Sequence, residues 1–153
     1  MKILMVCLGN ICRSPLAEGI MQMHLNSNDI EGIVDSAGVL SFHEGDPPQP
    51  GSIRVAANHG LDISNQKSRP FVADDFDKFD LIFTMDRSVH EQIASLTTNP
   101  DYLSRTHLLL DYAGNIELQD VPDPYRMPDD AFEKVYQLID EACRIIVSKI
   151  KTD

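Results

Sequence analysis

Short apolar runs alternate along this chain with segments of helical periodicity, and few folds accommodate such an order. Apolar runs at 3–6, 33–34, 80–85 and 108–110 predict four buried strands. Strands that alternate with helices favour a parallel sheet with helices on both faces. No repeat, low-complexity tract or linker divides the chain, so we predict one doubly wound α/β domain across residues 1–153.

Local signals indicate where the helices lie. Ser14 and Pro15 predict a helix start, with Ser14 at the N-cap and Pro15 at the first helical position. Further helices are expected at 53–59, at 89–96 and from Asp129 onward. The last helix carries an apolar stripe through Phe132, Val135, Leu138, Ala142, Ile145 and Ile150.

The carboxyl ends of the predicted strands indicate where a ligand can bind. In doubly wound sheets, ligands bind in the crevice outside these ends. Cys7, Ser36, Asp86 and the loop after Leu110 are therefore expected on the same rim.

The charge of the chain restricts its partners. The 153 residues include 24 Asp and Glu against 13 Lys and Arg, a formal net charge of -11 at pH 7. Nucleic acid or an anionic membrane is not the expected partner of so acidic a chain. An anionic substrate would meet overall repulsion, so a phosphate site must be built from backbone N–H groups and a few placed cations.

Targeting and cofactor signals are weak throughout the sequence. The amino-terminal apolar run is too short for a signal peptide, and no stretch approaches the length of a membrane span. Three cysteines without scaffold-like spacing indicate reduced thiols in a cytoplasmic protein. The five histidines show no ligand-like spacing, so we expect neither a metal nor another cofactor.

The segment from Cys7 to Arg13, here called the Cys7 loop, carries the strongest chemical signal. It lies between a predicted strand and a predicted helix, where successive N–H groups and the helix dipole can surround an anion. Gly9 and Asn10 suit the left-handed backbone of such a loop. We expect a Cys7 thiolate to attack phosphorus, Arg13 to hold two phosphoryl oxygens, and Ser14 to donate a hydrogen bond to the sulfur.

A thiolate nucleophile needs an acid to protonate the leaving group. Asp123 is the candidate, because the prolines on either side of it stiffen a loop that can lie over the rim. The same carboxylate could later deprotonate the water that hydrolyses a phosphocysteine. Catalytic roles are therefore predicted for Cys7, Arg13 and Asp123.

At these motifs the chain resembles the low-molecular-weight protein tyrosine phosphatase family, over essentially its whole length. The motifs are CLGNICRSP at 7–15, DSAG at 35–38 and DPY at 123–125. The resemblance implies a four-stranded parallel sheet and hydrolysis of phosphotyrosine in proteins. It also implies that Asn10 and Ser36 support the Cys7 loop. Residues expected to bind phosphate or support that loop are Leu8, Gly9, Asn10, Ile11, Cys12, Ser14 and Ser36.

Further positions look like specificity features of that family. Ile11 matches members that act on phosphotyrosine, whereas relatives that act on phosphoarginine carry threonine there. Phe42 and Tyr125 fall where aromatic walls line the substrate slot. Gln66 and Arg126 depart from the common pattern, which has histidine and a second tyrosine at these positions.

Two residues near the expected site allow further hypotheses. Asp86 could orient Arg13, or it could cap the helix that follows it. The sulfur of Cys12 should lie close enough to that of Cys7 for a reversible disulfide, which would protect Cys7 from irreversible oxidation.

Two rival functions remain at this point. The related thiol-dependent arsenate reductases need further resolving cysteines, and none occurs between Cys12 and Cys143. A phosphate-binding module or a phosphocysteine carrier could dispense with Asp123. The partner we expect is a phosphotyrosine-containing protein, and the chain itself is expected to be a monomer or a weak homo-oligomer.

Overall fold

The sheet is built around the first strand of the chain. The computed structural model describes residues 1–115 and 117–153. All strand pairings within the sheet are parallel, and the strand order is β2-β1-β3-β4. In chain order the elements are β1 (Lys2–Cys7), α1 (Arg13–Ser27), β2 (Ile33–Gly38), α2 (Pro50–Asn58), α3 (Asp75–Lys78), β3 (Leu81–Thr84), α4 (Arg87–Ala94), α5 (Pro100–Ser104), β4 (Thr106–Leu108), α6 (Leu109–Tyr112) and α7 (Asp129–Thr152).

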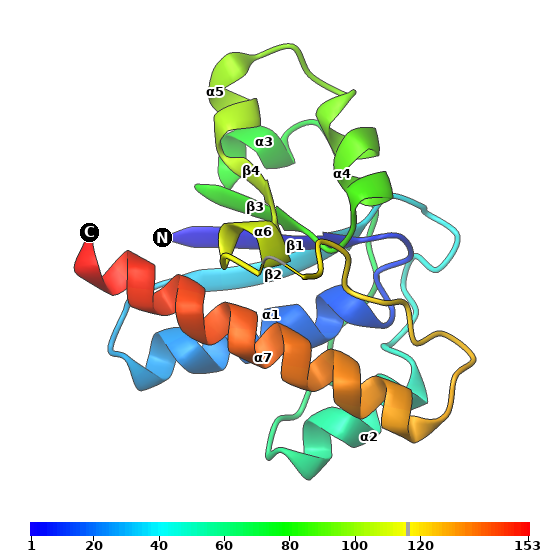
Figure 1. Ribbon diagram of the computed structural model, residues 1–153. Helices are drawn as coiled ribbons and strands as arrows, with labels where there is room; N and C mark the ends of the chain where they lie inside the picture. Colours follow the sequence, from blue (N-terminus) through cyan, green and yellow to red (C-terminus); the bar gives the residue numbers. More distant parts are fainter. Residues whose placement is uncertain (116) are drawn as a thin grey trace.

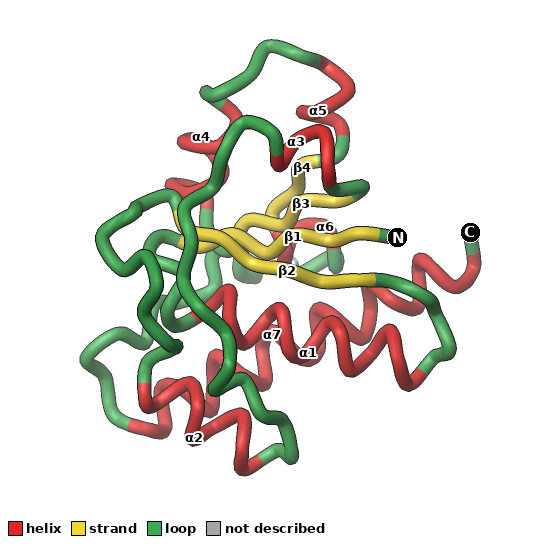
Figure 2. Tube along the Cα trace, turned by 180° about the vertical axis from the view of Figure 1, so that it is seen from behind, coloured by secondary structure: helices red, strands yellow, loops and turns green. Residues whose placement is uncertain are grey.

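Helices cover both faces of this sheet. Figure 1 shows α1, α2 and α7 on one side and α3, α4 and α5 on the other, and Figure 2 shows the same layers from behind. Ile3 and Met5 pack in the core under α1 and α7, whereas Leu4 and Val6 pack in the core under α3 and α4. A strand that is buried on both faces is typical of a parallel sheet. The predicted doubly wound α/β fold is therefore confirmed.

The start of α1 differs from the prediction. Cys12 is the N-cap and Arg13 is the first helical residue, so Pro15 stands at the third helical position. A proline is tolerated there, since the first four N–H groups of a helix have no partner within the helix. Ser14 does not cap the helix, because its hydroxyl lies against the Cys7 sulfur at 3.0 Å. Only Asn10 of the Cys7 loop has a left-handed backbone, with φ of 57°.

The fourth strand also lies earlier than predicted. It spans Thr106–Leu108, and the next residues form the short helix α6. Leu109 and Leu110 are buried on that helix, and a short apolar run does not distinguish a buried strand from a buried helix. Helix α2 begins at Pro50 rather than at residue 53, because proline fits the first helical position.

The final helix begins at Asp129, as predicted, and runs to Thr152. Its buried face is displaced from the predicted stripe, since Leu138, Ile145 and Ile150 are only partly buried at the margin. The fully packed positions are Phe132, Val135, Tyr136, Ile139, Ala142, Cys143, Ile146 and Val147. No helix among the described residues has the length and apolar character needed to cross a membrane.

Candidate active site

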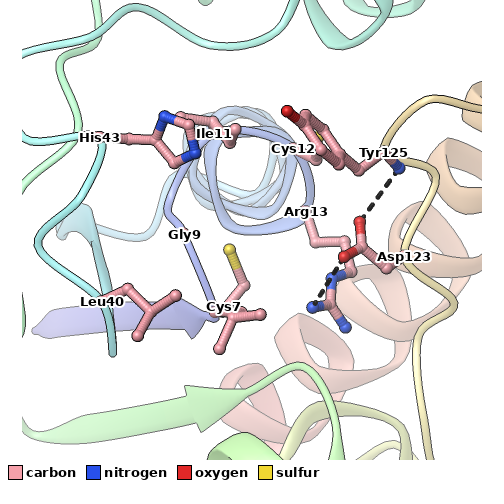
Figure 3. Close-up of a pocket in the computed structure, with 10 residues that line it drawn as sticks. Cys7, Gly9, Ile11, Cys12, Arg13, Leu40, His43, Asp123 and Tyr125 are labelled. Carbon is pink, nitrogen blue, oxygen red and sulfur yellow. Dashed lines mark hydrogen bonds and ion pairs between the residues drawn. The ribbon is translucent and has the colours of Figure 1, made fainter.

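A pocket of about 130 Å³ opens at the carboxyl end of β1. Figure 3 shows the Cys7 sulfur on its floor, with Asp123 and Tyr125 on one wall and Leu40 and His43 on the other. The lining residues are Cys7, Leu8, Gly9, Ile11, Cys12, Arg13, Leu40, His43, Asp123 and Tyr125. Ligand sites in open α/β sheets occupy this position, outside the ends of the strands.

Cys7 lies at the bottom of the pocket, where two groups approach its sulfur. The side chain is 2% exposed and stands at the end of β1, facing the first turn of α1. Its Sγ accepts the backbone N–H of Asn10 at 3.2 Å and lies 3.0 Å from the hydroxyl of Ser14. These donors, together with the N-terminal end of a 15-residue helix, favour a negative charge on or above the sulfur.

The Cys7 loop is supported by the side-chain amide of Asn10. Asn10 Oδ1 accepts the backbone N–H of Arg69 at 3.0 Å, while Nδ2 donates to Ser14 at 2.7 Å and to Ser36 at 2.9 Å. Asn10 is 2% exposed, so these bonds are shielded from water. Gln66, a residue that departs from the family pattern, does not bond to Asn10 or Ser36; its Nε2 donates to the carbonyl of Pro15 at 3.0 Å.

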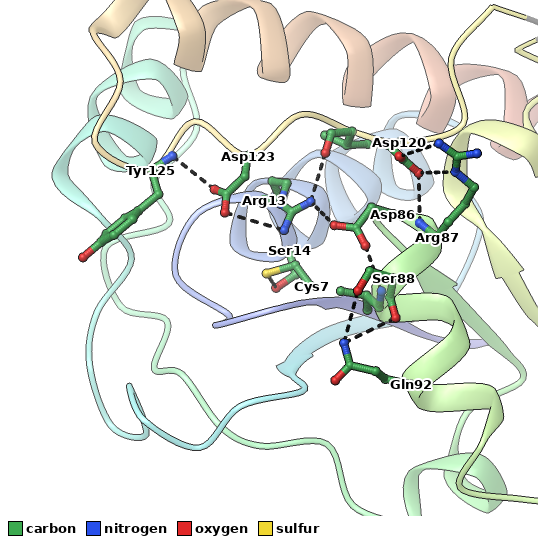
Figure 4. A network of polar contacts seen from close by, with 12 residues as sticks. Cys7, Arg13, Ser14, Asp86, Arg87, Ser88, Gln92, Asp120, Asp123 and Tyr125 are labelled. Atoms are coloured by element: carbon green, nitrogen blue, oxygen red, sulfur yellow. Dashed lines mark hydrogen bonds and ion pairs between the residues drawn. The ribbon is translucent and has the colours of Figure 1, made fainter.

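Arg13 is held rigidly beside Cys7, as Figure 4 shows. Its Nη1 donates to Asp86 Oδ2 at 2.6 Å and to the carbonyl of Val121 at 2.9 Å, and Nη2 lies 3.8 Å from Asp123 Oδ2. Burial disfavours the charged form of this side chain. The negative charges of Cys7, Asp86 and Asp123 outweigh that cost, so the pKa of Arg13 lies above its ordinary value. Nη1 is thus occupied by two fixed acceptors, and Nη2 faces Asp123 across the pocket.

Both hypotheses for Asp86 hold in the structure. One carboxylate oxygen accepts the hydrogen bond from Arg13, and the other accepts the backbone N–H of Val89 at 2.8 Å as the N-cap of α4. A single carboxylate therefore starts a helix on one face of the sheet and fixes a guanidinium at the pocket.

Asp123 occupies the wall opposite His43. Its Oδ1 accepts the backbone N–H of Tyr125 at 3.1 Å, which closes a tight turn and points the carboxylate toward the pocket. The carboxylate side chain is 46% exposed, so it can exchange protons with water. Tyr125 is 39% exposed, and its ring forms part of the lining.

The structure corrects the expectation for Phe42. This side chain is 85% exposed and is not among the pocket-lining residues. It packs edge-on against His43, with ring centroids 4.9 Å apart. Leu40, two residues before Phe42, and His43, the residue after it, line the pocket in its place. No sequence signal distinguishes His43 from Phe42 here, since the direction of loop side chains depends on tertiary contacts.

Cys12 lines the same pocket as Cys7, and both are free thiols. Burial, and then the negative charges of Asp123 and Cys7, raise the pKa of Cys12 to about 12. Cys12 therefore remains a neutral thiol at physiological pH. Cys143 is fully buried on α7, outside the pocket.

Comparisons with known proteins agree with this geometry. Residues 2–153 match the family described as low molecular weight phosphotyrosine protein phosphatase. The low molecular weight protein-tyrosine-phosphatase YfkJ of Bacillus subtilis is 37% identical over 99% of this chain and 97% of its own length. The chain belongs to the low-molecular-weight protein-tyrosine-phosphatase family. It is therefore a phosphoric monoester hydrolase, and phosphoproteins are its substrates.

Solved structures of the phosphatase family share the whole fold. The protein tyrosine phosphatase of Entamoeba histolytica, with Hepes in its active site, superposes with a TM-score of 0.93 at 34% identity, covering 99% of this chain and 97% of that one. The Drosophila arginine phosphatase DARP has the same TM-score and identity, covering 100% of this chain and 99% of that one. The fold thus occurs with two substrate classes, and pocket residues must distinguish them.

Proposed function

We propose that this phosphatase hydrolyses phosphotyrosine in proteins, and small aryl phosphates, through a phosphocysteine on Cys7. The observation that carries the proposal is the convergence of Cys7, Arg13 and Asp123 on one pocket of about 130 Å³. Cys7 and Arg13 stand at the two ends of the Cys7 loop and Asp123 comes from a loop far along the chain, and each supplies a different requirement of phosphoryl transfer. These are a nucleophile, a planar cation for the phosphoryl oxygens, and a proton donor.

In the first step the Cys7 thiolate attacks phosphorus. A phosphorus–sulfur bond forms as the bond from phosphorus to the tyrosine oxygen breaks, and Asp123 gives its proton to that oxygen. The N–H groups of the Cys7 loop and the Nη2 group of Arg13, which faces the pocket, stabilise the charge on the phosphoryl oxygens. Ser14 supports the sulfur by its contact at 3.0 Å.

In the second step water hydrolyses the phosphocysteine. The Asp123 carboxylate takes a proton from a water molecule as the water oxygen attacks phosphorus. The phosphorus–sulfur bond breaks, and inorganic phosphate and the Cys7 thiolate are released. The 46% exposure of the Asp123 side chain supports this role, because water can reach the carboxylate.

The pocket lining supports phosphotyrosine as the substrate. Ile11 places an apolar side chain in the pocket where phosphoarginine-specific relatives carry threonine. Leu40 and Tyr125 add apolar surface on opposite walls, which suits a phenyl ring. The free thiols and the acidic net charge favour a reducing, cytoplasmic location. We also predict that the protein is a monomer or a weak homo-oligomer.

Steady release of inorganic phosphate from matched peptides tests the proposal. We expect a phosphotyrosine peptide to be cleaved at least 100-fold faster than its phosphoserine or phosphoarginine counterpart, roughly the gain from a well-fitted site. Cys7→Ser should abolish turnover, and Cys143→Ala should retain it as the matched control. Substantial turnover by Cys7→Ser, or preference for phosphoarginine, would contradict the proposal.

A further inference from the structure

A partly buried carboxylate stands at the far end of a hydrogen-bond chain that reaches Cys7. Glu18, on α1, accepts the hydroxyl hydrogen of Ser36 at 2.8 Å. Ser36 in turn accepts from Asn10 Nδ2 at 2.9 Å. The same Nδ2 donates at 2.7 Å to Ser14, whose hydroxyl lies 3.0 Å from the Cys7 sulfur. The mechanism described above makes no use of Glu18.

The direction of each hydrogen bond in this chain follows from its ends. Because the backbone N–H of Arg69 donates to Asn10 Oδ1, Nδ2 must be the donor to both hydroxyls. Ser36, which already accepts from Asn10, sends its own hydrogen to Glu18. Ser14 likewise accepts from Asn10, which leaves its hydroxyl hydrogen free to point at the Cys7 sulfur.

The charges around Glu18 leave its carboxylate without a fixed cation. Burial raises the pKa of Glu18 to about 7, against the opposing effect of the Ser36 hydrogen bond. Asp35 on β2 raises this pKa further, and Arg69 lowers it. Arg69 is itself paired with Asp35 and Asp75, and no ion pair to Glu18 occurs among the described residues.

A groove of about 610 Å³ lies on the other side of Glu18. Asp62, in the loop after α2, is the other titratable residue of its lining. Gln66 lines it too, and its Oε1 is buried without a hydrogen-bond partner in the described part of the chain. The described lining of the groove contains no cation that could pair with the Glu18 carboxylate.

We propose that Glu18 is a positioning residue for Cys7. The ionised carboxylate binds the hydrogen of Ser36, which orients the Asn10 amide and leaves Ser14 to donate to the attacking sulfur. A protonated carboxyl accepts more weakly, and it can present its own hydrogen to Ser36, where Asn10 already donates. Protonation of Glu18 therefore weakens the support of the nucleophile. The inference rests on the proposed role of Cys7.

Comparison of Glu18→Gln with the wild type across pH tests this role. The amide of Glu18→Gln is neutral at every pH and, like the protonated carboxyl, can present a hydrogen to Ser36, so the kcat ratio of variant to wild type should be near 1 at pH 6 and fall roughly threefold or more by pH 8. KM should change by less than about twofold, since the phosphate-binding groups are untouched. Glu31→Gln, at an exposed site outside the chain of hydrogen bonds, should give a flat ratio near 1.

Two further measurements separate positioning from general damage. In a Ser36→Ala background, Glu18→Gln should no longer change the pH dependence, because the connection to Asn10 is absent. The rate of Cys7 alkylation by iodoacetamide, followed by mass spectrometry, should show the same pH-dependent ratio without any substrate. A flat ratio between pH 6 and 8 in both assays, or an undiminished effect without Ser36, would overturn the proposal. Turnover by Cys7→Ser would instead contradict the proposed function.

Discussion

Replacing Asp123 with asparagine separates proton donation from the shape of its loop. The amide of Asp123→Asn keeps an oxygen that can accept the Tyr125 N–H, so the turn is retained. What the variant loses is the acidic proton and the ion pair with Arg13. That pair is 3.8 Å long and involves a carboxylate side chain that is 46% exposed, so it contributes at most about 1 kcal/mol, or roughly fivefold in rate.

A general acid contributes far more than that. We expect Asp123→Asn to slow formation of the phosphocysteine from phosphotyrosine by roughly 10²–10⁴-fold, equivalent to about 3–5 kcal/mol in the barrier. The loss should be smaller for p-nitrophenyl phosphate, because nitrophenolate leaves readily without a proton, whereas the phenol of tyrosine has a pKa of about 10.

Pre-steady-state burst kinetics with both substrates measure this step apart from hydrolysis of the intermediate. Asp120→Asn is the matched control, since Asp120 is in the same loop but pairs with Arg87, outside the pocket. A loss below tenfold, or an equal loss with both leaving groups, would refute the assignment. Asp123 would then only shape the loop.

Substitutions at four other positions test the structure. Asp86→Ala should lower the free energy of unfolding by about 3–5 kcal/mol in a urea titration, because the buried guanidinium of Arg13 loses its carboxylate partner. Asp86→Asn should lower it by less than half as much, and equal losses for the two variants would contradict this reasoning. Gly38→Ala should weaken binding of inorganic phosphate at least tenfold in calorimetry, because the new Cβ would stand 2.9 Å from the backbone of the Cys7 loop; unchanged affinity would refute it. Cys12→Ser should retain turnover but lose thiol-reversible recovery after mild peroxide, and peptide mapping should find a Cys7–Cys12 disulfide only in the wild type. The raised pKa of Glu18 should make the free energy of unfolding fall by up to about 3 kcal/mol as pH rises from 4.5 to 7, because in this range the Glu18 carboxyl keeps its proton only in the folded state. Glu18→Gln should remove this dependence of the unfolding free energy on pH.

The sequence predicted the parts of the site that are local in the chain. A buried strand, a loop with Asn10 and a helix start lie within 15 consecutive residues, so their order predicts both an anion cradle and a nucleophile. The four strands and the helices on both faces followed from periodicity. Element boundaries were less accurate at residues 13–15 and 106–112, where apolar or capping residues fit two alternatives.

Long-range partners were harder to predict. The groups that hold Arg13 lie 73 and 108 residues away, and one of them is a backbone carbonyl, which any residue can supply. Glu18 reads in the sequence as an ordinary acid on an amphipathic helix, and only the fold places it against Ser36. Which of the neighbours Phe42 and His43 lines the pocket depends on the path of an irregular loop, and that path is not readable from the sequence.

The central place of β1 has a consequence for synthesis on the ribosome. β1 pairs on both edges with strands that follow it in the chain, and α1 packs against the much later helix α7. Arg13 acquires its Val121 acceptor only after 108 further residues have been added. At about 5–20 residues per second, this interval lasts roughly 5–20 s. During that time Arg13 lacks one of its two fixed acceptors, so the complete pocket can form only after Val121 has emerged.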